Sequence, residues 1–294
     1  MGVRVKPAVT NGRINTAIEY IEFMSREIHS HGQNPSFVKT NLQNTTNKLS
    51  EGKRNTSEAS KISTQAKNAQ SSIPDSIFYK LLEIINPDSP ENPFKHSRLR
   101  NSLIVKLLIL TGTRKGAIAK LKIGDCDFTG DCNLIRITRT PDDKEDTRKY
   151  KPSQKTDSHT SYVDPDLMKL IDYYIENKRS RYPNAQSHEF IFVSEMSTKN
   201  TAGDPLSISS INYLFKVLSN ALGFNVHPHL LRYKWNEKFS EDTSGMTSEE
   251  VAKLRRYAMG WSRDSRMAEL YDRFKIASKV ATLQKTRQIE LMGK

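Results

Sequence analysis

The sequence predicts a mainly α-helical protein of the α+β class, with a small antiparallel β-sheet set among the helices. Long stretches repeat apolar residues at helical spacing, and two short stretches alternate and are rich in β-branched residues. Helices are expected before and after those two stretches, without the strand–helix alternation that builds a parallel sheet. The 294 residues show no internal repeat, so a solenoid or propeller is not expected.

The first expected element is an amphipathic helix in residues 12–31. Its apolar stripe consists of Ile14, Ala17, Ile18, Ile21 and Met24. The following residues 44–72 are polar and dotted with lysine, so they cannot bury enough apolar surface to offset the entropy of ordering. We therefore expect an N-terminal helix in residues 1–35, a polar flexible linker in 36–72, and a compact domain in 73–294.

The compact domain is expected to begin in residues 73–85, where Pro74 opens a helical apolar pattern. Residues 98–110 are too apolar for a surface helix and should lie in the core. Residues 132–140 have the alternation of a strand, and residues 155–163 are a candidate partner strand. A charged, turn-prone segment, PDDKEDTRKYKPS, separates the two.

Further helices are expected after the sheet, the first of them capped by Asp164 and Pro165. Its apolar stripe consists of Leu167, Leu170, Ile171, Tyr174 and Ile175. Residues 190–193, FIFV, fit either a short buried strand or a segment of the core. Helical patterns resume at SISSINYLFKVLSNAL, and Thr247 with Glu250 forms a capping box before VAKLRRYAM.

The charge of the chain favours a polyanionic partner, and nucleic acid before an anionic membrane. Forty-six lysines and arginines against 33 acidic residues give a formal net charge of +13. Apolar runs long enough to span a bilayer are absent, and the first ten residues lack the hydrophobic segment of a secretory signal. Cys126 and Cys132 lack histidines at zinc-like spacing, so we expect buried or incidental thiols in a reducing cytoplasm.

Two stretches offer groups that can hold a phosphate. In HPHLLRYKWNEKF, residues 227–239, His229 and Arg232 are three apart and would share one face of a helix. Arg114 follows a Thr-Gly-Thr turn where two core helices meet, and a planar guanidinium can grip two phosphate oxygens. Taken separately, each is equally compatible with a basic surface or a solvated capping arginine.

Other candidates can act on the bond itself. Lys155 stands at the start of the second expected strand and could donate a proton if its surroundings lower its pKa. Lys149 and Lys151 compete for that role, and all three are compatible with solubilising hairpin lysines. Trp261 and Tyr271 are compatible with aromatic residues that fill the core.

Taken together, these residues occur in an order and in local contexts that resemble one family. The C-terminal two-thirds of the chain resembles the catalytic domain of the tyrosine recombinases, or phage-type integrases. The resemblance rests on TGTRKGAIAKLKIGDCDF, KTDSHTSYVDPDLMKLI, HPHLLRYKW and MGWSRDSRMAELY, which match four family motifs in the family's order.

The resemblance implies a catalytic set composed of Arg114, Lys155, His229, Arg232, Trp261 and Tyr271. The two arginines would clamp the non-bridging oxygens of the scissile phosphate, with the histidine and tryptophan donating hydrogen bonds or supporting its position. The lysine would protonate the leaving 5′-oxygen, and the tyrosine would form a 3′-phosphotyrosyl bond. Preoriented cationic donors stabilise the charge that develops as the nucleophile adds. The covalent intermediate retains the energy of the broken bond, so this scheme needs neither ATP nor a metal or other cofactor.

The resemblance also implies partners and a setting. Double-stranded DNA is the expected substrate, a homotetramer on DNA the expected assembly, and the nucleoid in a bacterial cytoplasm the expected location, without a membrane partner. The biology would be integration, excision or resolution of a mobile element. The helix-prone C-terminal tail would dock on a neighbouring subunit or pack on its own domain. Residues 12–31 resemble only the last helix of a core-binding domain, so we expect a fragment, a truncated form or a reduced N-terminal part.

The chain departs from the family pattern near the first arginine and after the second. The acidic residue usual three positions after the first arginine is replaced by Ala117, unless Asp125 or Asp127 substitutes for it. The position after the second arginine, commonly histidine, is Tyr233.

A third departure affects the nucleophile. The interval from Trp261 to Tyr271 is one residue longer than usual, which leaves Tyr257 as the alternative nucleophile. Two other functions therefore stay open: a relaxing enzyme of the type IB topoisomerase kind, and a DNA-binding relative that kept the fold without catalysis.

Overall fold

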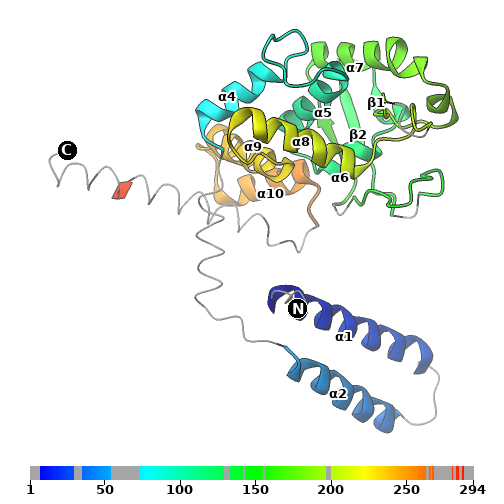
Figure 1. The fold of residues 1–294 in the computed structure, drawn as a ribbon. Helices are drawn as coiled ribbons and strands as arrows, with labels where there is room; N and C mark the ends of the chain where they lie inside the picture. The colour runs from blue at the N-terminus through cyan, green and yellow to red at the C-terminus, as the bar shows by residue number, and fades with distance from the viewer. Residues whose placement is uncertain are drawn as a thin grey trace, which may run out of the picture. The chain divides into compact units, whose positions relative to one another are not determined.

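The protein divides into two compact units, residues 1–68 and residues 69–294 (Figure 1). The structure is a computed structural model. It describes residues 7–29, 35–53, 73–128, 133–141, 143–154, 156–196 and 200–262, together with residues 265, 267, 280, 283, 284 and 287. Lys155 and Tyr271 lie outside the described residues, as do Cys132 and residues 54–72 of the expected linker.

The first unit pairs two helices, α1 (Pro7–His29) and α2 (Pro35–Glu51), which pack against each other. The residues of the predicted α1 stripe are half-buried, so that helix is confirmed. Helix α2 occupies residues 35–51, so the prediction of a linker beginning at residue 36 is wrong for that part. The signal for this helix is weak because α2 has only about one half-buried or buried apolar or threonine side chain per turn. These are Val38, Leu42, Thr46 and Leu49.

The second unit contains most of the helices. They are α4 (Asp75–Ile84), α5 (Arg98–Thr111), α6 (Lys115–Lys120), α7 (Pro165–Asn177), α8 (Ile208–Leu222), α9 (Pro228–Asp242) and α10 (Ser248–Met259). Three short 3₁₀ turns join them: η1 (Ile123–Asp125), η2 (Arg179–Arg181) and η3 (Pro183–Ser187). Among the described residues of the C-terminal tail, 280, 283, 284 and 287 are helical.

A three-stranded antiparallel sheet, in the order β1-β2-β3, lies among these helices. Strands β2 (Leu134–Ile137) and β3 (His159–Tyr162) pair so that Ile137 stands opposite His159. This confirms both predicted strands and their antiparallel pairing. Strand β1 (Cys126–Asp127) escaped prediction because two residues are too few to show an alternation. Cys126 is buried, as expected.

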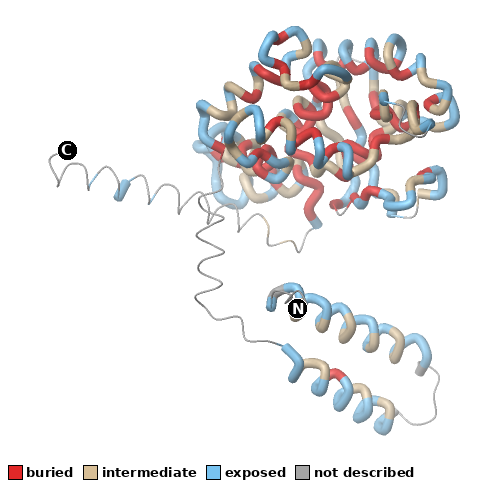
Figure 2. Tube along the Cα trace, viewed as in Figure 1, coloured by how far each residue is buried: buried red, intermediate tan, exposed pale blue. Residues whose placement is uncertain are grey.

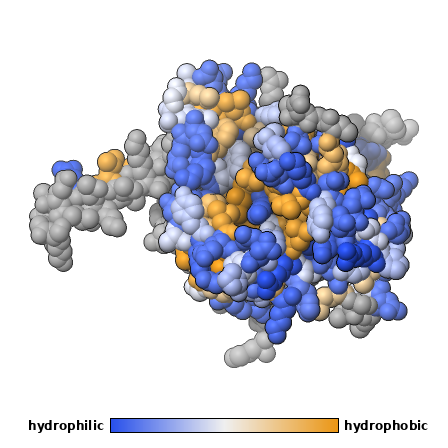
Figure 3. All heavy atoms as spheres, turned by 90° about the horizontal axis from the view of Figure 1, so that it is seen from above, coloured by the Kyte–Doolittle hydropathy of each residue, from blue (hydrophilic) through white to orange (hydrophobic). Residues whose placement is uncertain are grey.

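The core forms around α5, which is buried along most of its length, as its composition predicted (Figure 2). Residues 190–193 are all buried and pair only through isolated bridges, at Phe190 and at Val193, so this stretch is a core segment and not a strand. Around the core, the face seen in Figure 3 is largely hydrophilic, with hydrophobic residues gathered in a band between hydrophilic ones.

Two predicted caps are present, and one residue of the apolar stripe predicted for α7 is not buried. The Asp164 side chain accepts hydrogen bonds from two amides at the start of α7, and Thr247 and Glu250 form the capping box of α10. Leu170 is 39% exposed, whereas Met168 is buried in its place. At 100° per residue, Met168 lies closer to the centre of the buried face of α7 than Leu170 does. None of the helices in the described part of the chain could cross a membrane.

Candidate active site

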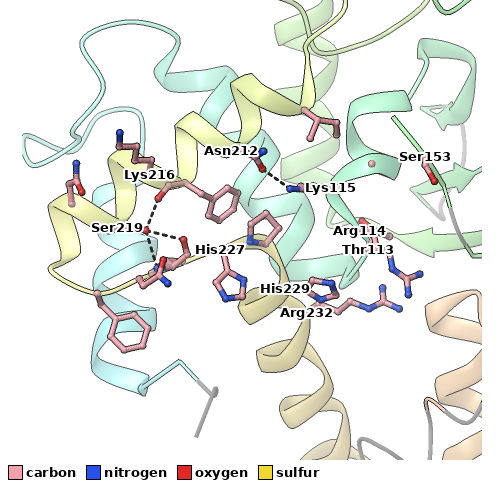
Figure 4. A pocket seen from close by; sticks show the side chains of 18 of the residues that line it. Thr113, Arg114, Lys115, Ser153, Asn212, Lys216, Ser219, His227, His229 and Arg232 are labelled. Carbon is pink, nitrogen blue, oxygen red and sulfur yellow. Dashed lines mark hydrogen bonds between the residues drawn. The ribbon is translucent and has the colours of Figure 1, made fainter. Parts of the chain in front are cut away.

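A basic cavity of about 1290 Å³ lies among α6, α8 and α9 (Figure 4). Its cationic and titratable lining residues are Arg114, Lys115, Lys216, His227, His229 and Arg232. Apolar side chains, among them Phe215, Phe224 and Val226, line the part near the end of α8. The cavity therefore has one strongly basic end, and an anionic group is the ligand that this end would attract.

Arg114 reaches the cavity from the turn between α5 and α6. Gly112 ends α5 in the left-handed conformation (φ 61°), and Arg114 then takes extended backbone geometry as the residue preceding α6. The hydroxyls of Thr111 and Thr113 are 2.8 Å apart and hydrogen-bonded, which holds the turn together. Arg114 thus stands where two core helices meet, as the sequence predicted.

His229 and Arg232 come from the first two turns of α9, which begins with Pro228. The amino end of a helix carries partial positive charge and presents amide groups to an anion, so it adds to the attraction for phosphate. Arg232 is buried, and its Nη1 donates to the carbonyl oxygen of Gly112 at 2.6 Å. Its Nη2 donates to the carbonyl oxygen of Met259 at 3.5 Å. Arg232 is therefore tied to the ends of both α5 and α10.

Trp261 is placed by the way α10 ends. Gly260 adopts φ 58°, its amide donates to the Tyr257 carbonyl, and the Trp261 amide donates to the Arg256 carbonyl. This left-handed helix ending turns the chain sharply inward. The Trp261 ring is buried, and its centroid lies 5.6 Å from the Arg232 guanidinium carbon. The tryptophan thus supports the second arginine from the side of α10.

The arginines, Lys115 and the histidines are close enough for the cationic charges to lower the pKa values of the histidines. Burial lowers the pKa of His229, and the nearby charges of Arg232 and Arg114 lower it further. Burial and the charge of Lys115 lower the pKa of His227 as well. Because the ordinary pKa of histidine is about 6.5, both imidazoles are neutral at pH 7 in the protein alone.

The chain on both sides of Lys155 is held against the site. Ser153 lines the cavity, and a Cβ placed on Gly116 would overlap the Ser153 carbonyl oxygen. Gln154 and Thr156 are both buried, and the Gln154 amide donates to the Thr156 hydroxyl at 2.6 Å. The residues flanking Lys155 are therefore packed residues of the domain, although Lys155 itself lies outside the described part of the chain.

The segment leading to Lys155 is anchored by charge pairs. Arg148 forms a buried ion pair with Asp146 at 2.8 Å and also donates to the Ala119 and Leu206 carbonyls. Lys122 pairs with Asp143 at 3.2 Å. The turn-prone sequence of this segment concealed these anchors, because they join it to residues distant in the sequence.

The competing lysines are engaged elsewhere and do not line the cavity. Lys151 donates to the Asp143 carbonyl at 2.9 Å, and the Lys149 ammonium lies 5.6 Å from the centre of the Tyr150 ring.

The departures from the family motifs have visible consequences. Ala117 is buried and brings no carboxylate to Arg114. The Asp125 carboxylate, proposed as a substitute, accepts from the Lys122 amide at 2.9 Å and the Thr138 hydroxyl at 3.4 Å, so it serves the local turn. Tyr233 places its ring 6.1 Å from the His229 ring. The alternative nucleophile, Tyr257, is 65% exposed on α10.

The structure adds three residues that the motifs did not single out. Lys115 and His227 line the cavity, and Lys115 donates to Asn212 at 2.5 Å. His159, on β3, is close enough to Arg232 for that charge to lower its pKa. Lys115 directly follows Arg114, and His227 lies two residues before His229, so proximity to the motifs was the available signal. For His159, the only feature in the sequence that pointed to the site was its position four residues after Lys155.

Comparison with known proteins identifies relatives by family and by fold. The phage integrase family matches residues 78–274, whereas no curated protein matches the chain. A XerH site-specific recombinase bound to its difH substrate before cleavage has 18% sequence identity and a TM-score of 0.50, over 69% of this chain and 50% of that one. The same recombinase after cleavage of a palindromic difH substrate has 18% identity and a TM-score of 0.50, over 73% and 53%.

A Tn1549 transposon integrase in complex with transposon right-end DNA has 13% identity and a TM-score of 0.49, over 97% of this chain and 95% of that one. The chain spans about half the length of the XerH chains that it matches. The XerH structures share its fold, and the family match covers more than half of the 294 residues. By that match, the chain belongs to the phage integrase family.

Proposed function

We propose that this protein is a site-specific DNA recombinase that cleaves and rejoins DNA through a 3′-phosphotyrosyl intermediate. The observation that carries the proposal is the convergence of Arg114, His229 and Arg232 at one end of a basic cavity, with Trp261 against Arg232. These four residues come from motifs spread over about half the sequence. The family match and the fold shared with a recombinase bound to its DNA substrate support the same activity.

The arginines supply the main electrostatic stabilisation in this proposal. Each guanidinium can donate two parallel hydrogen bonds to phosphate oxygens. Arg232 is already held by the Gly112 and Met259 carbonyls, so little reorganisation is needed when charge develops on the phosphate. Burial removes water from around Arg232 and thereby strengthens its attraction for the pentavalent transition state.

The remaining roles follow the reaction's proton and bond balance. The Tyr271 hydroxyl attacks phosphorus as its proton passes to solvent water, the bond from phosphorus to the 5′-oxygen breaks, and Lys155 gives a proton to that oxygen. His229, neutral at pH 7, and Trp261 donate hydrogen bonds to the phosphate or support its position. Attack by a 5′-hydroxyl on the phosphotyrosine reverses every step, so joining consumes no external energy.

The proposal extends to partners and setting. Double-stranded DNA is the substrate, the protein works as a homotetramer on DNA, and a bacterial cytoplasm at the nucleoid is its location. Residues 73–294 form the catalytic domain, with residues 1–35 as a remnant of a core-binding domain. The net charge of +13 supports binding to DNA, whose phosphates provide sequence-independent attraction.

One observation favours a second candidate, a DNA-binding relative without catalysis. Ala117 occupies the position where the family usually has an acidic residue, so Arg114 receives no carboxylate from it. If Arg114 were poorly oriented, the protein would bind DNA and leave it intact.

Strand exchange between paired sites tests the proposal against both alternatives. Segments tiling the DNA that flanks the gene would be cloned in pairs on a supercoiled plasmid, incubated with the full chain and sequenced for rearranged junctions. A recombinase produces junctions at a defined site pair, and the Arg232→Ala variant produces none. Relaxed plasmid without junctions would indicate a topoisomerase, and unchanged plasmid despite DNA binding would indicate the non-catalytic relative.

A further inference from the structure

His159 lies at a corner where strand β3 meets the end of α10. The Asp157 amide donates to the Gly260 carbonyl at 2.8 Å, which joins the chain before β3 to the turn after α10. A Cβ placed on Gly260 would overlap His159 Nδ1 and lie 2.6 Å from the Asp157 carbonyl oxygen. The imidazole is therefore in direct contact with the backbone of Gly260, the residue that precedes Trp261.

The hydrogen bonding of His159 defines its tautomer. Nδ1 lies 3.0 Å from the Asp157 carbonyl oxygen. A carbonyl oxygen only accepts hydrogen bonds, so Nδ1 carries the hydrogen and Nε2 is the unprotonated nitrogen. Nε2 is buried and has no hydrogen-bond partner among the described residues. Burial lowers the pKa of His159, the Asp157 carbonyl partly opposes this, and the charge of Arg232 lowers it further. The ring is thus neutral at pH 7.

The same corner connects two catalytic elements. On one side, the Met259 carbonyl accepts from Arg232, and Gly260 leads directly to Trp261. On the other side, Asp157 is two residues from Lys155, and the intervening Thr156 is buried. Packing between His159 and Gly260 therefore stands beside the Asp157–Gly260 hydrogen bond, which joins the chain that follows Lys155 to the corner that holds Arg232.

We propose that His159 is a positioning residue for DNA cleavage, whose ring packs between the chain before β3 and the Gly260–Trp261 corner. This inference rests on the proposed function, because it assigns His159 a part in the same reaction. It contacts no reacting atom. Its role is to hold the general acid and the Arg232–Trp261 pair at the separation that the transition state requires.

Protonation would weaken this packing because the described residues around the ring offer no compensating charge. On its own segment, the Asp157 carboxylate is paired with Arg139 at 3.4 Å. From α9 the facing charge is the Arg232 cation, and α10 presents Tyr257, whose hydroxyl is bonded to Thr160 at 3.2 Å. A second hydrogen on the ring would place a cation beside Arg232 and bury an N–H at Nε2.

The test compares His159→Ala and His159→Asn with the full wild-type chain. The measured rate is single-turnover formation of the covalent adduct on nicked duplexes that tile the DNA flanking the gene. Asparagine places an amide N–H near the position of Nδ1 and cannot be protonated. Thr160→Val is the matched control, since it removes a contact between the same strand and α10 without touching Gly260.

We expect His159→Ala to slow adduct formation about tenfold, since a displaced catalytic group loses alignment, while DNA affinity stays within about twofold. His159→Asn restores most of the rate by donating to the Asp157 carbonyl. Wild type loses rate as the pH falls through the lowered pKa of His159, and the asparagine variant retains its rate to lower pH. Thr160→Val stays within about twofold of wild type at every pH, because a mere loosening of this contact leaves the corner intact.

The outcomes separate this inference from the proposed function. If wild type forms the adduct and His159→Ala forms it at the same rate, the inference is wrong and the proposed function stands. If the rate of His159→Asn falls at the same low pH as the rate of wild type, the inference is also wrong, because another group is then titrating. Absence of any wild-type adduct overturns the proposed function and the inference together. Should His159→Ala fail to fold, as judged by thermal unfolding, the rate and pH profile of His159→Asn decide.

Discussion

Helices α8 and α10 end by the same local rule and serve different purposes. Each stops at a glycine in the left-handed conformation, Gly223 at φ 61° and Gly260 at φ 58°. A Cβ on Gly223 would meet nothing within 4 Å, whereas one on Gly260 would overlap the backbone and ring of the β3 segment. The end of α8 redirects the chain along the apolar part of the cavity wall, but the end of α10 builds the corner that supports Arg232 and Trp261.

The largest effect is expected where the α10 corner holds a catalytic cation. Arg232→Ala should slow adduct formation by about 10²–10³, because it removes a preorganised charge from the developing phosphorane. Single-turnover kinetics on the nicked duplexes measure this loss. Lys238→Ala, on an exposed part of the same helix, is the control and should stay within about twofold. Similar rates for Arg232→Ala and wild type would show that Arg232 does not take part in the reaction.

Replacing each of the two helix-ending glycines by alanine tests the difference between the ends of α8 and α10. Gly223→Ala should cost about 1–2 kcal/mol of unfolding free energy, from left-handed strain alone. Gly260→Ala carries the same strain plus overlap with His159 and Asp157, so it should cost more and also slow cleavage. Urea denaturation and adduct formation would be measured for both variants. Equal losses in both assays would contradict the account of the α10 corner.

Because of its histidines, the protein is expected to lose stability as the pH falls. The pKa of His159 is lowered in the folded protein, so its unfolded state binds the proton more readily. Stability should be full above about pH 6.5 and should be lost as the pH falls through the lowered pKa. Chemical denaturation should show this loss between pH 7 and pH 5, and His159→Asn should show less of it. An unchanged pH dependence in that variant would assign the titration to His227 or His229.

The smallest effect is expected on α8, whose exposed Lys216 lines the cavity far from the α10 corner. If Lys216 contacts a DNA phosphate, Lys216→Ala should weaken binding to all sequences and reduce the slope of log affinity against log salt by about 1. Fluorescence anisotropy at several salt concentrations gives that slope. If the DNA affinity of the wild-type protein did not change with salt, its positive charge would not serve to bind DNA phosphates.

The predictable parts of the molecule were those with local causes. Periodicity located α5, caps located the starts of α7 and α10, and β-branched alternation located β2. Three motif residues, Arg114, His229 and Arg232, meet in one cavity because the ends of their helices meet. The helices, caps and strand depend on residues within a turn or two of one another, whereas the meeting of the three motif residues was expected from the family resemblance.

The parts missed by sequence reasoning had distant causes. The α2 stripe is too sparse to be recognised without α1 beside it. The anchoring of Arg148 depends on carbonyls of Ala119 and Leu206, which no local pattern connects to it. His159 is an unremarkable strand residue until Gly260 is packed against it. Such contacts join segments about 30 to 100 positions apart in the sequence, so only the folded structure reveals them.

Covalent trapping tests the central claim, that a tyrosine of this chain becomes bonded to DNA, most directly. The full chain would be mixed with the tiled nicked duplexes, denatured in detergent and analysed for a protein–DNA adduct, alongside Tyr271→Phe and Tyr257→Phe. The account predicts an adduct with wild type and with Tyr257→Phe, its loss with Tyr271→Phe, and Tyr271 as the modified residue by mass spectrometry. An adduct that persists in Tyr271→Phe, or salt-sensitive DNA binding without any adduct, would contradict it.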